Sequence, residues 1–400
     1  MRAMSPNRRA ALALLASPLA APGLARAQAA ETVRTGRGPV RVSVFAEGLE
    51  RPWGAAFLPD GRLLVTERPG RLRLVGPDGR VSAPLAGAPP VEAAGQGGLL
   101  DVAVPPDFAA TREVFLSAAA LVQGGSAAGG QGGSAAGEAG ALTRLWRATL
   151  GPDGLQDLRA MLDAAPAQPR GRMHYGSRIA ISPDNAHIFM STGDRNEDRS
   201  RAQRPDDLAG KVLRLTRDGR IPRDNPFIGQ GGSDQAGARG EVWTLGHRNP
   251  QGIAFNPATG SLLTAEMGPR GGDELNLILP GRNFGWPTVS YGREYWGGAI
   301  AGGRTSAPEV SEPLRFWTPS VSPSGMAFAP ANGPWRGDLF LACLNPAGLL
   351  RIPMEGDAPG AEERLLWGKQ RMRQVVMAPD GALLILTDAE RGQILRVAPG

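Results

Sequence analysis

Short apolar runs dominate the chain and recur in one repeated unit. Each copy begins with a Gly or another small residue, continues through an alternating apolar strand and a turn of the Pro-Asp-Gly type, and ends in a second apolar strand. The six copies are PWGAAFLPDGRLLVTE (52–67), GGLLDVAVPPDFAATREVFLSAA (97–119), GSRIAISPDNAHIFMSTGD (176–194), NPQGIAFNPATGSLLTAEMG (249–268), SPSGMAFAPANGPWRGDLFLACL (322–344) and RQVVMAPDGALLILTD (373–388). Asp-Gly and Asn-containing turns between strands of period two are signals of β-hairpins. The pattern therefore predicts six hairpins of similar design.

A further short apolar strand follows several copies, as in GRLRLV, GKVLRL, GLLRI and GQILRV. A sheet of about four strands per copy is the unit of a β-propeller, so six copies predict six blades. A β-sandwich, or two unrelated β-domains, is the alternative, but radial repetition accounts better for the equivalence of the copies. We expect an all-β protein, a six-bladed β-propeller over residues 40–398, with long loops on the active-site face.

The copies are unevenly spaced, which places long loops between some of the strands. Residues 121–141, LVQGGSAAGGQGGSAAGEAGA, are rich in Gly, Ser and Ala and nearly uncharged. Such a composition cannot bury a core, so it predicts a flexible surface insertion. The segments 195–243 and 269–320 carry more charge, Trp and Pro, and we expect them to be ordered.

Residues 1–30 have the pattern of a signal peptide, with a basic start, an Ala/Leu run and a small-residue end at ARA or AQA. Arg8 and Arg9, directly before the apolar run, suggest the twin-arginine route, and a plain secretory signal is the alternative. The run is too short and too interrupted by Pro to span a bilayer, so no membrane insertion is expected. The sequence predicts a periplasmic or secreted protein.

The net charge gives little support to a polyanionic partner. The whole chain has a formal charge of +6, but residues 1–30 hold four arginines and no acid, which leaves 40 basic against 38 acidic side chains, about +2. We therefore expect neither nucleic acid nor an anionic membrane as partner. Cys343 is the single cysteine, so no internal disulfide can form, and its apolar flanks suit a buried thiol.

Polar side chains precede the first strand in four of the copies. They are Gln96 before the second copy, His174 before the third, Arg248 and Asn249 at the start of the fourth, and Arg371 and Arg373 at the start of the sixth. Inner strands of a propeller line a central channel, so side chains at their starts can converge on one ligand. Taken singly, each of these residues also fits a plainer role, as a core histidine, a solvated arginine or part of a tight Gly turn.

The chemistry of this set is coherent. Arginine grips carboxylates in bidentate fashion, and Arg371 and Arg373, two positions apart on a strand, share a face. His174 is the one member that can act as acid or base near neutral pH, and Asp194 could orient its imidazole. Separately, AEMGPRGGDELNLI (265–278) exposes carbonyls on a tight loop beside Asp273 and Glu274. Hard oxygen ligands of this kind suit Ca²⁺, and a solvated acidic turn is the alternative.

Several ordered motifs resemble those of the soluble quinoprotein sugar dehydrogenases, the aldose and glucose dehydrogenases that depend on pyrroloquinoline quinone (PQQ). The motifs are ERPWGAAFLPDGRLLVTER, GQGGLLDVAVPPDF, GKVLRLTRDGRIPRDNPF, LGHRNPQG, GPRGGDELN, NFGWP and MRQVVMAPDGALLILTD. The resemblance runs from about residue 40 to residue 398, apart from the Gly/Ser insertion.

The resemblance implies a six-bladed propeller and assigns roles to most of these residues. It places PQQ among Gln96, Arg248, Asn249, Arg371 and Arg373. It makes His174 the general base, supported by Asp194, for oxidation of the anomeric carbon of an aldose to the aldonolactone by hydride transfer to PQQ. It implies one Ca²⁺ on the carbonyls of Gly268 and Pro269 that polarises the quinone, and a second on Glu274 and the carbonyl of Phe284, with Glu294 as a further candidate.

One departure from the family pattern is Asn345, which stands where relatives carry a Lys. The absence of this Lys is expected to weaken PQQ binding or to change the redox potential of PQQ.

A Ca²⁺-dependent six-bladed lactonase is an alternative function, but it would hold its metal with side-chain carboxylates and amides and would not need an arginine cage. A non-catalytic propeller that binds a ligand is the third possibility. Trp286, Tyr291, Tyr295 and Trp296 could stack on a sugar, or only pack between loops.

Overall fold

The computed structural model describes Met1 and residues 30–123, 139–229 and 237–400. Nearly all of the predicted signal peptide 1–30 and most of the predicted insertion 121–141 lie outside these ranges. The flanking strands take in both ends of that insertion, since one strand ends at Val122 and the next begins at Gly140. No helix in the described ranges is long and apolar enough to cross a membrane.

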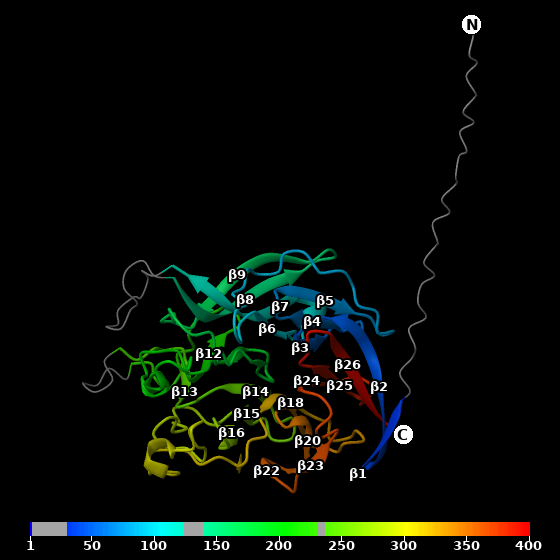
Figure 1. Ribbon diagram of the computed structural model, residues 1–400. Helices are drawn as coiled ribbons and strands as arrows, with labels where there is room; N and C mark the ends of the chain where they lie inside the picture. The colour runs from blue at the N-terminus through cyan, green and yellow to red at the C-terminus, as the bar shows by residue number, and fades with distance from the viewer. Residues whose placement is uncertain (2–29, 124–138, 230–236) are drawn as a thin grey trace.

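Six β-sheets stand in a ring within the described residues and form a six-bladed propeller, as predicted (Figure 1). The first three blades contain β3 (Pro52–Phe57), β4 (Leu63–Glu67) and β5 (Arg71–Val75); β6 (Leu99–Ala103), β7 (Glu113–Val122), β8 (Gly140–Leu150) and β9 (Leu155–Asp163); and β10 (Ile179–Ile181), β11 (His187–Ser191), β12 (Lys211–Thr216) and β13 (Val242–Leu245).

The last three blades contain β14 (Pro250–Phe255), β15 (Leu262–Glu266), β16 (Asp273–Ile278) and β17 (Arg315–Trp317); β18 (Pro323–Phe328), β19 (Leu339–Leu344), β20 (Ala347–Ile352) and β23 (Glu363–Leu365); and β24 (Met372–Met377), β25 (Leu383–Thr387) and β26 (Gly392–Pro399), joined by β2 (Gly38–Leu49) and β1 (Glu31–Thr35). Smaller elements are the pair β21 (Met354–Glu355) and β22 (Ala358–Pro359), α1 (Phe108–Thr111), and the 3₁₀ turns η1 (Arg199–Gln203) and η2 (Ile300–Gly303).

Each repeated sequence unit forms the two innermost strands of one blade. All blades are antiparallel, and the innermost strands β3, β6, β10, β14, β18 and β24 each contact the next one around the ring. The first strands therefore begin at one common mouth of the channel. This arrangement confirms the prediction that residues at equivalent places in different copies lie near one another.

The ring closes through its two chain ends. Strand β2 pairs antiparallel with β26, from Val40 opposite Pro399 to Leu49 opposite Gly392. The sixth sheet thus combines the first and the last strands of the chain, which lie side by side in Figure 1. Opening the ring at this blade would require these main-chain hydrogen bonds to break.

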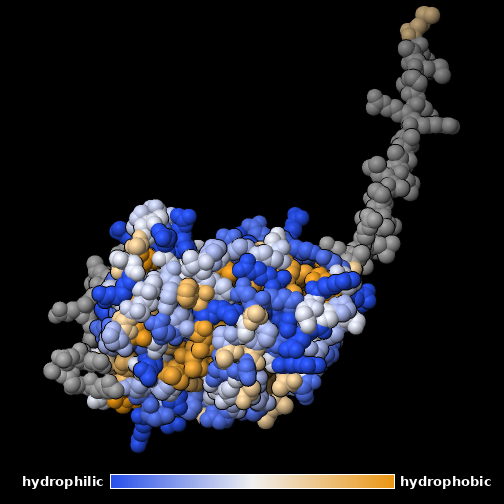
Figure 2. All heavy atoms as spheres, turned by 90° about the horizontal axis from the view of Figure 1, so that it is seen from below, coloured by the Kyte–Doolittle hydropathy of each residue, from blue (hydrophilic) through white to orange (hydrophobic). Residues whose placement is uncertain are grey.

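Apolar side chains pack between neighbouring blades. Leu64 and Leu72 of the first blade, for example, are fully buried against Leu99 and Val114 of the second. The face drawn in Figure 2 is mainly hydrophilic and carries apolar patches near its centre. Each Å² of apolar surface that is buried between blades contributes about 25 cal/mol of favourable free energy, and this stabilises the ring.

Arg178, directly before β10, plugs the channel and joins five blades. Its guanidinium donates to the carbonyls of Gln251 (2.7 Å) and Arg373 (2.9 Å) and to Asp101 Oδ1 (3.1 Å), and it lies 3.8 Å from the centre of the Trp53 ring. Burial lowers the pKa of Arg178 to about 10, which still leaves the side chain charged at neutral pH.

Replacing Arg178 by Met is expected to lower the free energy of unfolding by about 3–5 kcal/mol, because Asp101 would remain buried without its cation. Denaturant-induced unfolding measures the change. Arg396→Met is the matched control: Arg396 pairs with exposed Asp380, so its loss should cost less than about 1 kcal/mol. Equal effects of the two substitutions would contradict the central role of Arg178.

Candidate active site

A polar cavity of about 250 Å³ opens where the inner strands begin. Five blades contribute to its wall, and the lining residues are Trp53, Arg68, Gln96, Asn249, Gln251, Met267, Ser322, Leu344, Asn345, Arg371, Arg373 and Asp388. Arg178 lies directly below, bonded to the main chain of two lining residues. Four residues predicted to bind the cofactor, Gln96, Asn249, Arg371 and Arg373, therefore meet in one cavity.

His174 and Asp194 form a buried pair beside this cavity. His174 Nδ1 lies 2.7 Å from Asp194 Oδ1, and the side chains are only 4% and 0% exposed. Burial lowers the pKa of His174, and the charge of Arg248 adds to this effect, so the imidazole is neutral at pH 7. Burial alone would raise the pKa of Asp194, but its hydrogen bond to His174 holds the pKa below the usual value. The ionised carboxylate can only accept, so Nδ1 carries the proton and Nε2 keeps its lone pair.

The side-chain amides of Gln96 and Asn249 tie the His174 segment to the neighbouring blades. Gln96 Oε1 accepts a hydrogen bond from the backbone N–H of His174 (2.9 Å), and Asn249 Oδ1 accepts one from Gly176 (3.1 Å). The glycine before Gln96 permits this close approach, since Gly95 has φ +59° and a Cβ there would lie 2.4 Å from the carbonyl of Arg172, two residues before His174. Two blades thereby fix the backbone that carries His174.

Arg248 is an incompletely satisfied cation at the same mouth. Its Nη1 donates to the carbonyls of Met267 (2.8 Å) and Gly268 (3.1 Å), and its backbone N–H donates to Glu266 Oε2 (2.7 Å). Its Nε and Nη2 are buried and have no partner among the described residues. Unpaired buried donors on a guanidinium are costly, so this group is suited to an added anionic ligand.

Arg371 and Arg373 share one carboxylate on the opposite side of the ring from His174's blade. Arg371 Nη2 donates to Asp388 Oδ2 (2.7 Å), and Arg373 Nη2 donates to Asp388 Oδ1 (3.0 Å). Burial would raise the pKa of Asp388, but the two guanidinium groups hold it at about 2. The two arginines face the same way, as their spacing on a strand predicted, and Asp388 neutralises part of their charge.

The loop between β15 and β16 turns its main chain toward Arg248. The Gly268 carbonyl meets the Arg248 guanidinium, and the Pro269 carbonyl accepts no hydrogen bond among the described residues. The turn is too tight for side chains, because a Cβ on Gly268 would lie 2.1 Å from the Gly271 carbonyl. Asp273 holds this turn through the Gly268 N–H (2.8 Å), so its carboxylate serves the loop.

Glu274 faces Glu266 across β15 and β16, and both carboxylates accept from Asn276 Nδ2 at 3.1 Å. Burial raises the pKa of Glu274 well above its usual value, and the charge of Glu266 adds to this. Phe284 joins the same cluster, because its ring stacks at 4.7 Å on His247, whose Nδ1 lies 2.8 Å from Glu266 Oε1. His247 therefore braces a buried carboxylate.

No three His, Cys, Asp or Glu side chains in the described ranges gather into a metal cluster. A cation near Glu274 or Gly268 would therefore depend on main-chain oxygens, as the Gly-rich loop indicates. Glu294 does not join Glu274; its two oxygens bind Arg199 at 2.6 and 3.1 Å. The expectation that Glu294 completes the second cation site is not supported.

Four contacts escaped the sequence reasoning: those of Arg68, Arg178, Trp286 and Asp388. Arg68 lines the cavity, and Trp286 donates its Nε1–H to Asp194 Oδ2 at 2.7 Å. Asp388 had a usable signal, because it ends the sixth copy as Asp194 ends the third. Of the other loop aromatics, Tyr291 stacks on Phe316, while Tyr295 and Trp296 are 58% and 78% exposed.

Comparison with known proteins identifies the family. The model of the glucose/sorbosone dehydrogenase family matches residues 49–396. The chain belongs to this family. An aldose sugar dehydrogenase of Escherichia coli K12 is 38% identical over 365 residues, which cover 90% of this chain and 93% of that protein.

Solved structures of glucose/sorbosone dehydrogenases and their relatives share the architecture. The apo form of the E. coli aldose sugar dehydrogenase superposes with a TM-score of 0.81 at 36% identity, covering 90% of this chain and all of that one. A PQQ-bound aldose sugar dehydrogenase from Streptomyces coelicolor has a TM-score of 0.70 at 29% identity, with 90% and 98% of the two chains covered. A glucose dehydrogenase structure is 43% identical, with a TM-score of 0.81 and 90% and 99% coverage.

The depressed pKa of Asp388 makes a prediction about acid stability. Because its folded pKa of about 2 lies below the usual value near 4, the ionised pair with Arg371 and Arg373 stabilises the fold above about pH 4, and this contribution is lost as the pH falls toward 2. Asp388→Asn should cost about 2 kcal/mol of unfolding free energy at pH 7 and about half as much at pH 3.

Denaturant unfolding of the apo-protein at both pH values measures this difference. Asp380→Asn removes an exposed carboxylate that pairs with Arg396 and serves as the control, with little change expected at either pH. A gap between wild type and Asp388→Asn that stays constant with pH would contradict this role of the Asp388 carboxylate.

Proposed function

We propose that the protein is a PQQ-dependent aldose sugar dehydrogenase that oxidises the anomeric carbon of an aldose to the aldonolactone. The observation that carries the proposal is that neutral His174, bonded to ionised Asp194, lies beside an arginine-rich cavity at one channel mouth. The family and the names of its relatives from E. coli and S. coelicolor support the same activity.

The residues of the cavity fit PQQ, which is a tricarboxylate. Arg248 offers two buried donor nitrogens, Nε and Nη2, that lack partners among the described residues, and Arg371 and Arg373 present two further cations across the cavity. Guanidinium groups bind carboxylates with matched geometry, and Gln96 and Asn249 add amide NH₂ donors. When bound, PQQ would supply the acceptor for the hydride, which carries both electrons of sugar oxidation.

The oxygen-rich loop fits Ca²⁺ as a companion of PQQ. The carbonyls of Gly268 and Pro269 are the proposed ligands, beside Arg248, and hard main-chain oxygens are ligands that Ca²⁺ accepts. The second proposed Ca²⁺ uses Glu274 and the Phe284 carbonyl. The buried Glu274–Glu266 pair has no Lys or Arg partner among the described residues, so a divalent cation would relieve its repulsion.

The proton chemistry follows from the state of His174. With Nδ1–H donating to ionised Asp194, the free lone pair of Nε2 can accept the proton of the anomeric hydroxyl. Asp194 then stabilises the imidazolium that forms, while its other oxygen remains bound to Trp286. The low pKa of His174 keeps the base unprotonated at neutral pH.

The two alternatives fit the site less well. A lactonase of the kind considered would hold its metal with several side-chain carboxylates, and the described residues offer no such cluster. A non-catalytic binding module would not need the buried His174–Asp194 pair.

The cell location is a separate proposal. The pattern of residues 1–30 supports export, and fractionation should find a shortened chain in the periplasm or the medium.

The functional test is reconstitution of apo-protein with PQQ and Ca²⁺, followed by dye reduction with a panel of aldoses. We expect activity only with both additions, and an acid limb of kcat/KM below pH 6.5, because the pKa of His174 is lowered. Loss of the base in His174→Gln should reduce kcat by about 10²–10⁴-fold while PQQ still binds. No turnover of any aldose and no absorbance change on adding PQQ would sink the proposal.

Substitution of Asn345 tests the effect of the Lys that relatives carry at this place. Asn345 lines the cavity beside Leu344, whose carbonyl accepts a hydrogen bond from Arg371 (3.3 Å). Asn345→Lys adds a cation to the cavity and is expected to tighten PQQ binding by about tenfold or more, as a charge-assisted hydrogen bond would. Titration of apo-protein with PQQ measures the affinity. Asn345→Met, of similar length but uncharged, is the control, and equal affinities of the two variants would end the idea.

A further inference from the structure

Asp194 has a second partner that no role yet explains. Its Oδ1 accepts from His174 Nδ1 (2.7 Å) and from the Asn196 N–H (2.8 Å), while its Oδ2 accepts from Trp286 Nε1 (2.7 Å). Trp286 comes from the connection between β16 and β17, which is 92 residues away along the chain. A distant loop therefore fixes the carboxylate that orients the proposed base.

Trp286 is itself held firmly. The residue is 5% exposed, and its ring packs with Ala202 and Ile300. Its backbone N–H donates to the Gly246 carbonyl (2.9 Å), and its carbonyl accepts from Gln203 Nε2 (2.7 Å). The backbone on both sides of the ring is thus fixed, with the indole N–H directed toward Asp194.

Two guanidinium groups lie against the same indole. The Arg199 and Arg248 guanidinium carbons are each 5.4 Å from its ring centre. Arg199 also makes the two-pronged ion pair with Glu294, which joins the loop after β11 to the loop that carries Trp286. Cations near an aromatic face are attracted to it, so these contacts stabilise the ring position.

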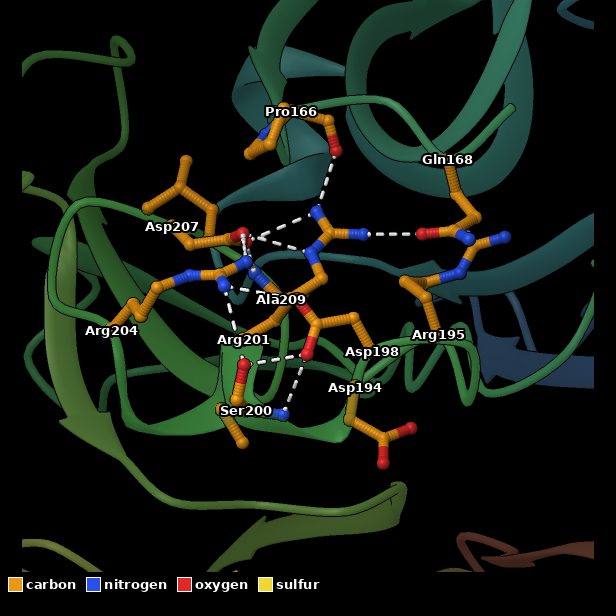
Figure 3. A network of polar contacts seen from close by, with 12 residues as sticks. Pro166, Gln168, Asp194, Arg195, Asp198, Ser200, Arg201, Arg204, Asp207 and Ala209 are labelled. Carbon is orange, nitrogen blue, oxygen red and sulfur yellow. Dashed lines mark hydrogen bonds and ion pairs between the residues drawn. The ribbon is translucent and has the colours of Figure 1, made fainter. Parts of the chain in front are cut away.

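The loop that carries Asp194 is braced by a network of its own (Figure 3). Arg201 donates to Asp207 Oδ2 (2.8 Å), to Gln168 Oε1 (2.8 Å) and to the Pro166 carbonyl (2.6 Å). Asp194 lies at the start of this segment, next to Arg195. With both loops fixed, the hydrogen bond between Trp286 and Asp194 has a set geometry.

We propose that Trp286 is a positioning residue that acts through Asp194 on His174. The proposal rests on the proposed function and adds to it. The indole N–H holds the carboxylate so that Oδ1 faces Nδ1, which keeps Nε2 free as the proton acceptor. It also draws negative charge toward Oδ2, which limits how strongly Asp194 stabilises the protonated imidazole. No proton leaves the indole in the reaction.

Trp286→Phe is the direct test, because it keeps an aromatic ring and removes the N–H. In the reconstituted enzyme we expect kcat to fall about 10–100-fold, the loss of a hydrogen bond to a charged group, with KM for the sugar and the affinity for PQQ within about twofold. The acid limb of kcat/KM should move to higher pH, because a less compensated Asp194 favours the imidazolium.

Titration of His174 by NMR in the apo-protein gives a readout that does not need activity. The chain has three histidines, so His174→Gln assigns the signal. Asp194, Arg248 and Arg195 are the charged groups that act on His174, and all three remain in Trp286→Phe. We expect a higher pKa for His174 in this variant than in wild type.

Trp335→Phe is the matched control. Trp335 is a buried indole whose N–H donates to the Gly381 carbonyl (3.2 Å), in hairpins at the other end of the inner strands, so neither kcat nor the His174 titration should change. An unchanged His174 pKa in Trp286→Phe, a raised sugar KM with normal kcat, or lost PQQ binding would each overturn the proposal. If wild type itself lacks PQQ-dependent activity, the proposed function fails, while the NMR comparison still judges the effect of Trp286.

Discussion

One buried guanidinium decides how the channel of this propeller is used. Arg178 reaches from the third blade to main-chain or side-chain oxygens of three others and covers the Trp53 ring of a fourth. Every bond of Arg178 joins different blades. If the ring widened, these bonds would break and the buried guanidinium would be left without hydrogen-bond partners. The plug gives the cavity above it a fixed floor, and that cavity therefore opens toward the mouth where the inner strands begin.

Above this floor, carboxylates neutralise only part of the positive charge of the arginines. Asp388 serves Arg371 and Arg373 together, whereas Arg248 meets only carbonyls on one edge of its guanidinium. The cavity is thus stable without a ligand and still electrostatically incomplete. An anionic ligand would satisfy Arg248 directly and would compete with Asp388 for the other pair, so cofactor affinity and the stability of the empty protein are set by the same residues.

The sequence predicted the features that repeat and missed those that occur once. Six equivalent hairpins specify a ring, and the ring brings Gln96, Asn249 and Arg373 to one mouth without any knowledge of side-chain contacts. The ion pair of Glu294 with Arg199 was missed because Arg199 comes from another long loop, and nothing in the repeat places two loops relative to one another. The bond between Trp286 and Asp194 was invisible for the same reason. Arg178 lies in an apolar stretch, and nothing in the local sequence indicated that its side chain contacts four other blades.

A comparison of two blades explains why a cation suits Glu274. Glu67 and Glu266 end the second strand of their copies, opposite Pro52 and Pro250, and both are buried. Across the next strand pair, however, Glu67 faces Arg71, and Arg71 Nε lies 2.7 Å from its carboxylate. Glu266 faces Glu274 at the same place. The first blade thus pairs its buried acid with an arginine, while the fourth places a second buried carboxyl group beside it. The His247 imidazole reaches only Glu266, with Nδ1 2.8 Å from Oε1, so a divalent ion in the fourth blade would do what Arg71 does in the first.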